Sequence, residues 1–167
     1  MDWETMDQQL RRRIQPRILE IGTLMKITAA GVVFLAKDTG RCLLQLREGG
    51  KKFNHTWGFW GGMMENGETP YECIIRELDE ELGIVPELAK LNPIDVYQSK
   101  DKNFYYYSFV YVVEEEFRPP KLNGESAGYA WVNIGRWPKP LHNGAKITLY
   151  KNGGTEKLHT ILDIHSK

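Results

Sequence analysis

A single helix with well-marked ends constrains the fold of this chain more than any other feature. Thr69 is a good N-cap, Pro70 suits the first helical position, and Glu72 completes a capping box. Gly83 supplies the residue type with which many helices end. Between these signals, apolar residues recur at helical spacing and form one stripe: Ile74, Ile75, Leu78 and Leu82. The sequence therefore predicts an amphipathic helix that packs one face on a core.

The segments on either side of this helix are typical of β-strands. Residues 26–36 form a β-branched, apolar run that ends at the turn signal Asp38-Thr39-Gly40, and residues 42–46 fit its hairpin partner. Further strands are predicted at 94–97, 104–113 and 129–133, and a closing helix at 156–164. Strands interrupted by single helices predict an α/β fold, with a mixed sheet and helices on its faces.

Composition limits the domain count and the class of partner. A chain of 167 residues fits one domain, and residues 1–24, with a basic cluster and Pro16, are interpreted as an extension before a domain at 25–167. The 22 basic residues balance the 22 acidic ones, so neither nucleic acid nor a membrane is expected as a partner. Cys42 and Cys73 fit buried free thiols, which indicates the cytoplasm.

Three glutamates next to the apolar stripe are an unfavourable arrangement that needs an explanation. Glu77, Glu80 and Glu81 follow one another at i, i+3 and i+4, where like charges repel by a few tenths of a kcal/mol, roughly, for each pair. They also lie toward the helix C-terminus, where the macrodipole disfavours negative charge. The cluster is either a solvated acidic face or a site for a hard divalent cation such as Mg2+ or Mn2+.

The spacing around these glutamates decides between the two explanations. From Gly62 to Ile84 the sequence matches, without a gap, the pattern Gly-x5-Glu-x7-Arg-Glu-U-x-Glu-Glu-x-Gly-U, where U is a bulky aliphatic residue. This pattern is the Nudix box, and the chain resembles the Nudix hydrolases of the MutT-like kind over residues 25–165. The resemblance implies an α/β/α sandwich with a mixed β-sheet between helices.

The resemblance also implies roles for the residues of the box. The implied metal ligands are Glu77, Glu80, Glu81 and the backbone carbonyl of Gly61, with Glu77 and Glu81 the foremost, and Glu80 is alternatively the general base. The resemblance implies structural roles in the box for Gly62, Glu68, Arg76 and Gly83, with Glu68 and Arg76 forming a salt bridge. The implied reaction is attack of a metal-bound water on one phosphorus of a diphosphate.

Several residues outside the box have both a functional and a structural interpretation. Glu125, upstream of Trp131, resembles the extra acidic residue that many relatives recruit for catalysis, although it also fits a polar turn. Arg47 could contact a substrate phosphate or solvent. The run Glu114–Glu116 fits a solvated strand end, and His142 a loop residue. Aromatic side chains fit core packing before base stacking: Trp57, Phe59, Trp60, Phe104, Tyr105, Tyr106 and Tyr107.

Two positions depart from the family pattern without affecting the carboxylates. Trp60 stands where relatives often have proline, and Met63 where they often have a basic residue. The lack of a cation at position 63 puts one familiar mode of phosphate binding in doubt.

The predicted function is a metal-dependent pyrophosphohydrolase that acts on a nucleoside triphosphate or another nucleoside diphosphate-linked compound. One alternative is a hydrolase of nucleotide sugars, ADP-ribose or dinucleotides. Another is a non-catalytic Nudix module that senses a nucleotide, and a third is a structural acidic helix that binds cations adventitiously. A homodimer fits both the family and the extra segment at the N-terminus.

Overall fold

Strand β1 (Ile27–Ala36) lies inside the sheet and organises the rest of the fold. The computed structural model describes residues 26–48 and 55–166. Nearly every residue of β1 is buried, because both of its faces are covered. Within the described residues the remaining strands are β2 (Arg41–Arg47), β3 (Trp57–Gly58), β4 (Trp60–Met63), β5 (Leu91–Gln98), β6 (Phe104–Val113) and β7 (Ser126–Asn133). The predicted extension at 1–24 lies outside the described residues.

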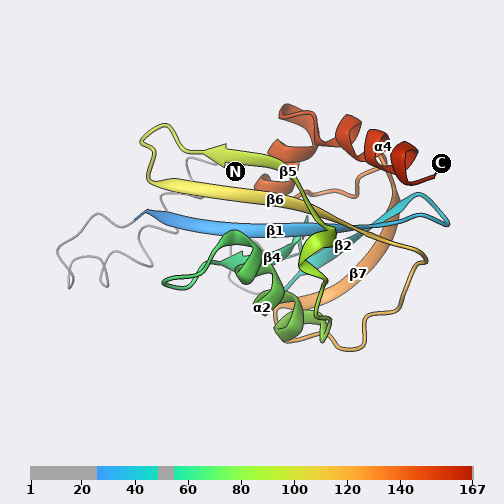
Figure 1. Cartoon of the computed structure of the whole chain (residues 1–167), viewed down its shortest axis with the longest axis horizontal. Helices are drawn as coiled ribbons and strands as arrows, with labels where there is room; N and C mark the ends of the chain where they lie inside the picture. Colours follow the sequence, from blue (N-terminus) through green and yellow to red (C-terminus); the bar gives the residue numbers. More distant parts are fainter. Residues whose placement is uncertain (1–25, 49–54, 167) are drawn as a thin grey trace.

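The described strands form one mixed sheet in the order β3-β2-β1-β6-β5. Strand β1 pairs antiparallel with β2 and β4 and parallel with β6. Strand β5 pairs antiparallel with β6, and β7 pairs antiparallel with β2. The helical segments are α2 (Pro70–Leu82), η1 (Leu88–Lys90), α3 (Asn143–Lys146), η2 (Ile147–Lys151) and α4 (Gly154–His165). Helices α2 and α4 lie on opposite faces of the sheet (Figure 1).

Each face of the sheet has its own hydrophobic core. On the α2 side, Val32 and Phe34 of β1 pack with Leu78 of the helix. On the other side, Val33 and Leu35 belong to a second cluster with Leu158 of α4 and residues of α3 and η2. Successive side chains of a strand point to opposite faces, so one apolar strand contributes to both clusters. The predicted α/β/α sandwich is confirmed.

The ends of α2 follow the sequence signals closely. Thr69 accepts a hydrogen bond from the Glu72 backbone N–H at 3.2 Å, and the Glu72 carboxylate accepts one from the Thr69 N–H at 3.4 Å. Gly83 ends the helix with φ 69°. The buried stripe differs slightly from the predicted one, because Cys73 is fully buried against β4 while Ile75 is only half-buried.

Some predicted boundaries were too short. Strand β5 begins at Leu91 and includes Pro93, which an edge strand tolerates beside the register shift between Pro93 and Asp95. Strand β7 begins at Ser126, and α4 begins at Gly154. No helix among the described residues is long and apolar enough to cross a membrane.

Candidate active site

A pair of glycines brings strand β4 into close contact with β1 and with helix α2. Gly61 has φ +144°, and a Cβ there would overlap the carbonyl oxygen of Ala30. A Cβ at Gly62 would overlap the carboxylate of Glu77 and lie 2.7 Å from its Cδ. A side chain at position 61 would clash with backbone, and one at position 62 would displace the Glu77 carboxylate, so the two glycines allow the close approach of the β4 backbone to β1 and to Glu77.

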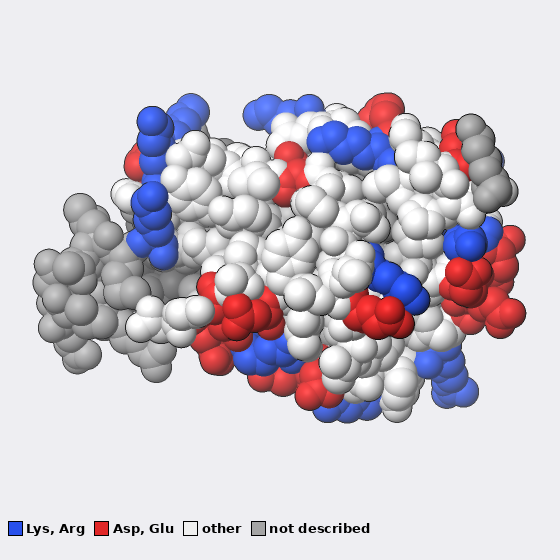
Figure 2. All heavy atoms as spheres, viewed as in Figure 1, with Lys and Arg blue, Asp and Glu red and all other residues white. Residues whose placement is uncertain are grey.

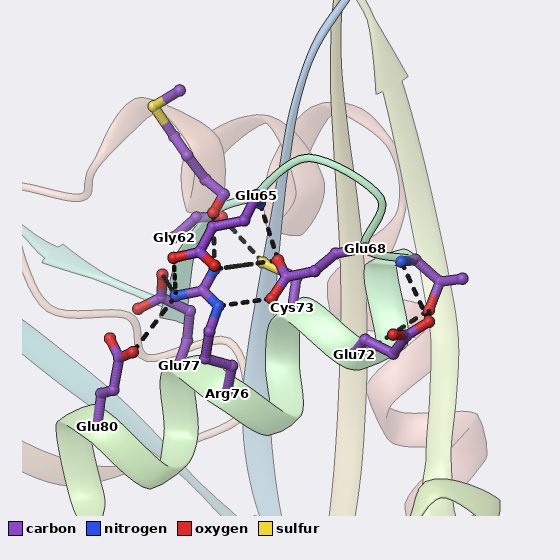
Figure 3. A network of polar contacts seen from close by, with 10 residues as sticks. Gly62, Glu65, Glu68, Glu72, Cys73, Arg76, Glu77 and Glu80 are labelled. Carbon is purple, nitrogen blue, oxygen red and sulfur yellow. Dashed lines mark hydrogen bonds and ion pairs between the residues drawn. The ribbon is translucent and has the colours of Figure 1, made fainter.

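Arg76 ties the loop after β4 to the helix. Its guanidinium donates to both carboxylate oxygens of Glu68, at 2.6 and 3.1 Å, and to the Met63 carbonyl at 3.0 Å (Figure 3). It also donates to Glu77 Oε1 at 3.0 Å. The pKa of the Glu68 carboxyl is lowered, chiefly by the hydrogen bonds from Arg76. The predicted salt bridge is confirmed, and Arg76 also orients one of the predicted metal ligands.

The structure separates the three glutamates of the box by exposure. Glu77 is 9% exposed and Glu81 is 1% exposed, so both are buried beside the apolar stripe. The side chain of Glu80 is 56% exposed and lies 3.6 Å from Arg76 (Figure 3). Two of the predicted ligands therefore lie on the inner side of α2, and the third faces solvent next to the arginine.

Burial makes the two inner carboxylates unusual acids. The pKa of Glu81 is raised to about 9, first by desolvation and then by the charge of Glu77. A backbone hydrogen bond from Gly61 opposes this rise. Desolvation likewise raises the pKa of Glu77, although Arg76 lowers it. Desolvation disfavours the charged form, so these carboxyls would ionise at neutral pH only with a positive charge such as a metal ion nearby.

Glu125 and Arg47 lie near the inner carboxylates although they belong to different strands or loops. The charge of Glu125, just before β7, raises the pKa values of both Glu77 and Glu81. The charge of Arg47, at the end of β2, lowers that of Glu81. The structure thus brings together the acidic residue and the arginine that the sequence selected outside the box.

One polar contact of this region was missed by the sequence analysis. Gln45 of β2 is 3% exposed, and its amide nitrogen donates to Ser126 Oγ at 2.5 Å and to Glu81 Oε2 at 3.5 Å. The feature of the sequence that could have indicated this contact is the single amide side chain, Gln45, within an otherwise apolar part of the strand.

The remaining predicted residues have structural contacts. His142 caps α3 by accepting from the Gly144 N–H at 3.3 Å, and burial lowers its pKa to about 3. Glu114 pairs with Lys37, and Glu116 with Arg41, at the β1–β2 turn. Trp60 is fully buried and donates its indole N–H to the Leu43 carbonyl.

The donor set fits a hard divalent cation. Glu77, Glu81 and the Gly61 backbone offer oxygen ligands, which Mg2+ and Mn2+ prefer. Within residues 26–48 and 55–166, no three His, Cys, Asp or Glu side chains already converge as a complete binding group. Mg2+ usually takes one or two protein carboxylates and leaves the rest of its coordination shell to water and substrate phosphates, which fits this pair of carboxylates. Charges of both signs are mixed over the visible surface (Figure 2).

A family model places these features in a known context, since the NUDIX domain model matches residues 25–151. The chain belongs to the Nudix family. This Nudix chain is 34% identical over 104 residues to the 8-oxo-dGTP diphosphatase of Haemophilus influenzae, covering 62% of the chain and 73% of the relative. It is 33% identical over 132 residues to an isopentenyl-diphosphate Delta-isomerase of Streptomyces coelicolor, covering 68% and 65%. It is 26% identical over 117 residues to the ADP-ribose pyrophosphatase of Methanocaldococcus jannaschii, covering 66% and 68%.

Solved structures agree with the Nudix fold. A MutT NUDIX hydrolase from Burkholderia pseudomallei superposes with a TM-score of 0.58 at 22% identity, covering 75% of this chain and 96% of that one. The MutT protein of Methanosarcina mazei gives a TM-score of 0.58 at 20% identity, covering 82% and 95%. These likenesses concern the fold alone. Together with the family match and the named diphosphatase and pyrophosphatase relatives, they confirm the predicted fold and the class of hydrolase acting on phosphorus-containing anhydrides.

Proposed function

We propose that this Nudix hydrolase cleaves a phosphoanhydride bond of a nucleoside triphosphate with the help of Mg2+ or Mn2+. The observation that carries the proposal is the burial of Glu77 and Glu81 on the face of α2 that meets the glycine pair. Two neighbouring carboxylates in that position are costly without a counter-charge. The complete box supports catalysis over the alternative of a nucleotide-sensing module.

Each residue has a role in this proposal. Glu77, Glu81 and the Gly61 carbonyl would hold the ion, with Glu80 at its solvent side. When bound, a divalent cation lowers the pKa of a water molecule and neutralises phosphate oxygens. Glu125 would accept the proton of the attacking water, because its charge acts on both inner carboxylates while Glu80 faces Arg76.

Substrate recognition is proposed for residues on the β2 side of the site. Arg47 supplies a cation near Glu81 and would contact a phosphate of the substrate. A Cβ at Gly58 would lie 3.6 Å from Arg47 Cδ and 3.2 Å from His142 Cβ, so these three positions are neighbours.

Two alternatives concern the substrate and the reaction. The likeness to an ADP-ribose pyrophosphatase supports a nucleoside diphosphate linked to a sugar as the second substrate class. The likeness to an isopentenyl-diphosphate isomerase makes isomerisation of a small diphosphate worth testing.

A substrate panel with a matched variant tests the proposal. Wild-type protein and Glu81→Gln would be incubated with dGTP, 8-oxo-dGTP, ADP-ribose, GDP-mannose, a dinucleoside polyphosphate and isopentenyl diphosphate, each with Mg2+ or Mn2+. We expect a triphosphate to give a monophosphate and pyrophosphate, with a loss of at least about 100-fold in Glu81→Gln. Tight nucleotide binding without turnover of any compound would instead favour the sensor.

We also propose a cytoplasmic location and a homodimer. The buried free thiols of Cys42 and Cys73 support a reducing compartment. Light scattering of the full chain would test the dimer.

A further inference from the structure

Gln45 is a polar residue of strand β2 whose side chain contacts helix α2. Its neighbours Leu43 and Leu44 are fully buried in the two cores, whereas Gln45 places an amide in the same buried layer as Leu43. A buried amide costs roughly 1–3 kcal/mol if it makes no hydrogen bond, so its two contacts account for its presence. Those contacts are Ser126 Oγ at 2.5 Å and Glu81 Oε2 at 3.5 Å.

The two contacts lead to two acidic residues of the site. Glu81 belongs to α2, and Ser126 directly follows Glu125 at the start of β7. The position of Glu125 is also fixed by its backbone, because its carbonyl accepts from the Glu48 N–H at 2.8 Å and its N–H donates to Asn123 Oδ1 at 3.1 Å. Gln45 is therefore the side-chain link between the helix carboxylate and the loop that carries the other acid.

The surroundings of Glu81 show why a neutral donor matters there. Glu77 and Glu125 repel its charge, while the Gly61 backbone and Arg47 favour it. The Gln45 amide adds a neutral donor 3.5 Å from Glu81 Oε2, which favours one orientation of the carboxylate. Partners that orient a metal ligand in this way typically change metal affinity by about 10- to 100-fold when they are removed.

We propose that Gln45 is a positioning residue that holds the Glu81 carboxylate and, through Ser126, the Glu125 loop at the separation that the divalent cation and the substrate require. This inference rests on the proposed function of the same site. It assigns no catalytic step to Gln45. An apolar side chain at position 45 would leave the strand intact and remove the contacts to both Glu81 and Ser126.

The test is Mn2+ binding to the substrate-free protein, measured by electron paramagnetic resonance. Gln45→Met keeps the length of the side chain and removes both donors, Gln45→Asn keeps the amide but shortens its reach, and Ser126→Ala removes one contact only. We expect Gln45→Met to weaken Mn2+ binding by about 10-fold or more and to lower kcat more than it raises KM for the nucleotide. Gln45→Asn should lie between Gln45→Met and wild type, and Ser126→Ala should chiefly lower kcat.

A purely structural role would give a different result. In that case Gln45→Met would lower the melting temperature while Mn2+ affinity stays within about twofold of wild type, and the inference would be overturned. If Gln45→Met does not fold, unchanged Mn2+ affinity in Gln45→Asn and unchanged kcat in Ser126→Ala would overturn it equally.

Glu81→Gln, measured in parallel, separates this inference from the proposed function. If Glu81→Gln leaves Mn2+ binding and turnover unchanged, the proposed metal site itself fails. If Glu81→Gln weakens both while the Gln45 and Ser126 variants match wild type, only the positioning role fails.

Discussion

The backbone of Gly62 touches the carboxylate of Glu77, so closely that a methyl group at position 62 would lie 2.7 Å from Glu77 Cδ. A strand glycine and a helix glutamate fifteen positions apart in the sequence are thereby held in one geometry. The relationship explains in steric terms why the box begins with glycine, and it makes the position of Glu77 sensitive to the smallest substitution.

Gly62→Ala should therefore displace Glu77 and lower kcat/KM by about 100-fold, because a shift of about 1 Å at a reacting centre can cost that much. The matched control is Gly128→Ala, since a Cβ at Gly128 meets nothing within 4 Å. Steady-state kinetics of both variants checks the prediction, and equal activity in the two would contradict it.

The raised pKa of Glu81, about 9, makes the metal-free protein less stable as the pH rises. The unfolded chain ionises this carboxyl near 4.5, whereas the folded protein keeps it protonated until about 9. The folded state therefore holds the extra proton across that window, and stability falls as the pH rises through it. In the presence of a chelator, the melting temperature of wild type should fall by several degrees relative to Glu81→Gln between pH 5 and about 9. Parallel curves for the two proteins would refute the assignment.

Arg76→Lys should destabilise the protein by about 1–2 kcal/mol and reduce turnover, because lysine cannot make the paired contacts to Glu68 while also reaching the Met63 carbonyl. Arg41 is a useful control, since it makes a similar paired contact with Glu116 at the β1–β2 turn. Arg41→Lys should leave kcat unchanged. Urea unfolding and kinetics would be measured on both, and loss of turnover in Arg41→Lys would count against a local role of Arg76.

Thr69→Ala removes the N-cap of α2 and should cost about 1 kcal/mol of folding free energy. The carboxylates lie farther along the helix, so kcat should change little. Thr160→Ala, which removes an exposed bond to the Glu156 carbonyl in α4, is the control and should cost less. Denaturant titrations would show the difference; a larger effect at position 160 would contradict the capping argument.

Asn143→Ala should not lower the melting temperature, because the buried amide donor that it removes has no hydrogen-bond partner among the described residues. Thermal unfolding of the variant beside wild type checks this prediction, and a clearly lower melting temperature would show that the amide serves the fold.

Local signals were sufficient to predict helix α2. Its cap, its first proline and its terminal glycine act within one or two turns, so both ends could be located from the sequence. The burial of Cys73 in place of Ile75 could not be predicted in this way, because it depends on where β4 packs against the helix. Strand β5 was predicted too short because Pro93 is a poor strand residue except at an edge, and the edge position follows only from the sheet order.

The parts of the site that follow from the residue spacing of the box could be predicted from the sequence. The parts that depend on tertiary contacts could not. The Arg76–Glu68 pair follows from the motif, whereas the 3.6 Å approach of Glu80 to Arg76 depends on how the two side chains lie on the surface of α2. Gln45 was missed because one glutamine in a strand is equally typical of a solvent-facing position. Its burial arises from α2 and β7 covering it, which the local sequence does not encode.

The shared use of β1 by both cores has a consequence for the accuracy of the site. Gly31 faces Gly61 across the β1–β4 ladder, while Val32 and Val33 fill opposite cores. A slip by one residue would send every side chain of β1 to the wrong layer. Packing on both faces therefore fixes the register of β1. The alignment of the glycines with the acidic residues of α2 is maintained by apolar contacts that take no part in the chemistry.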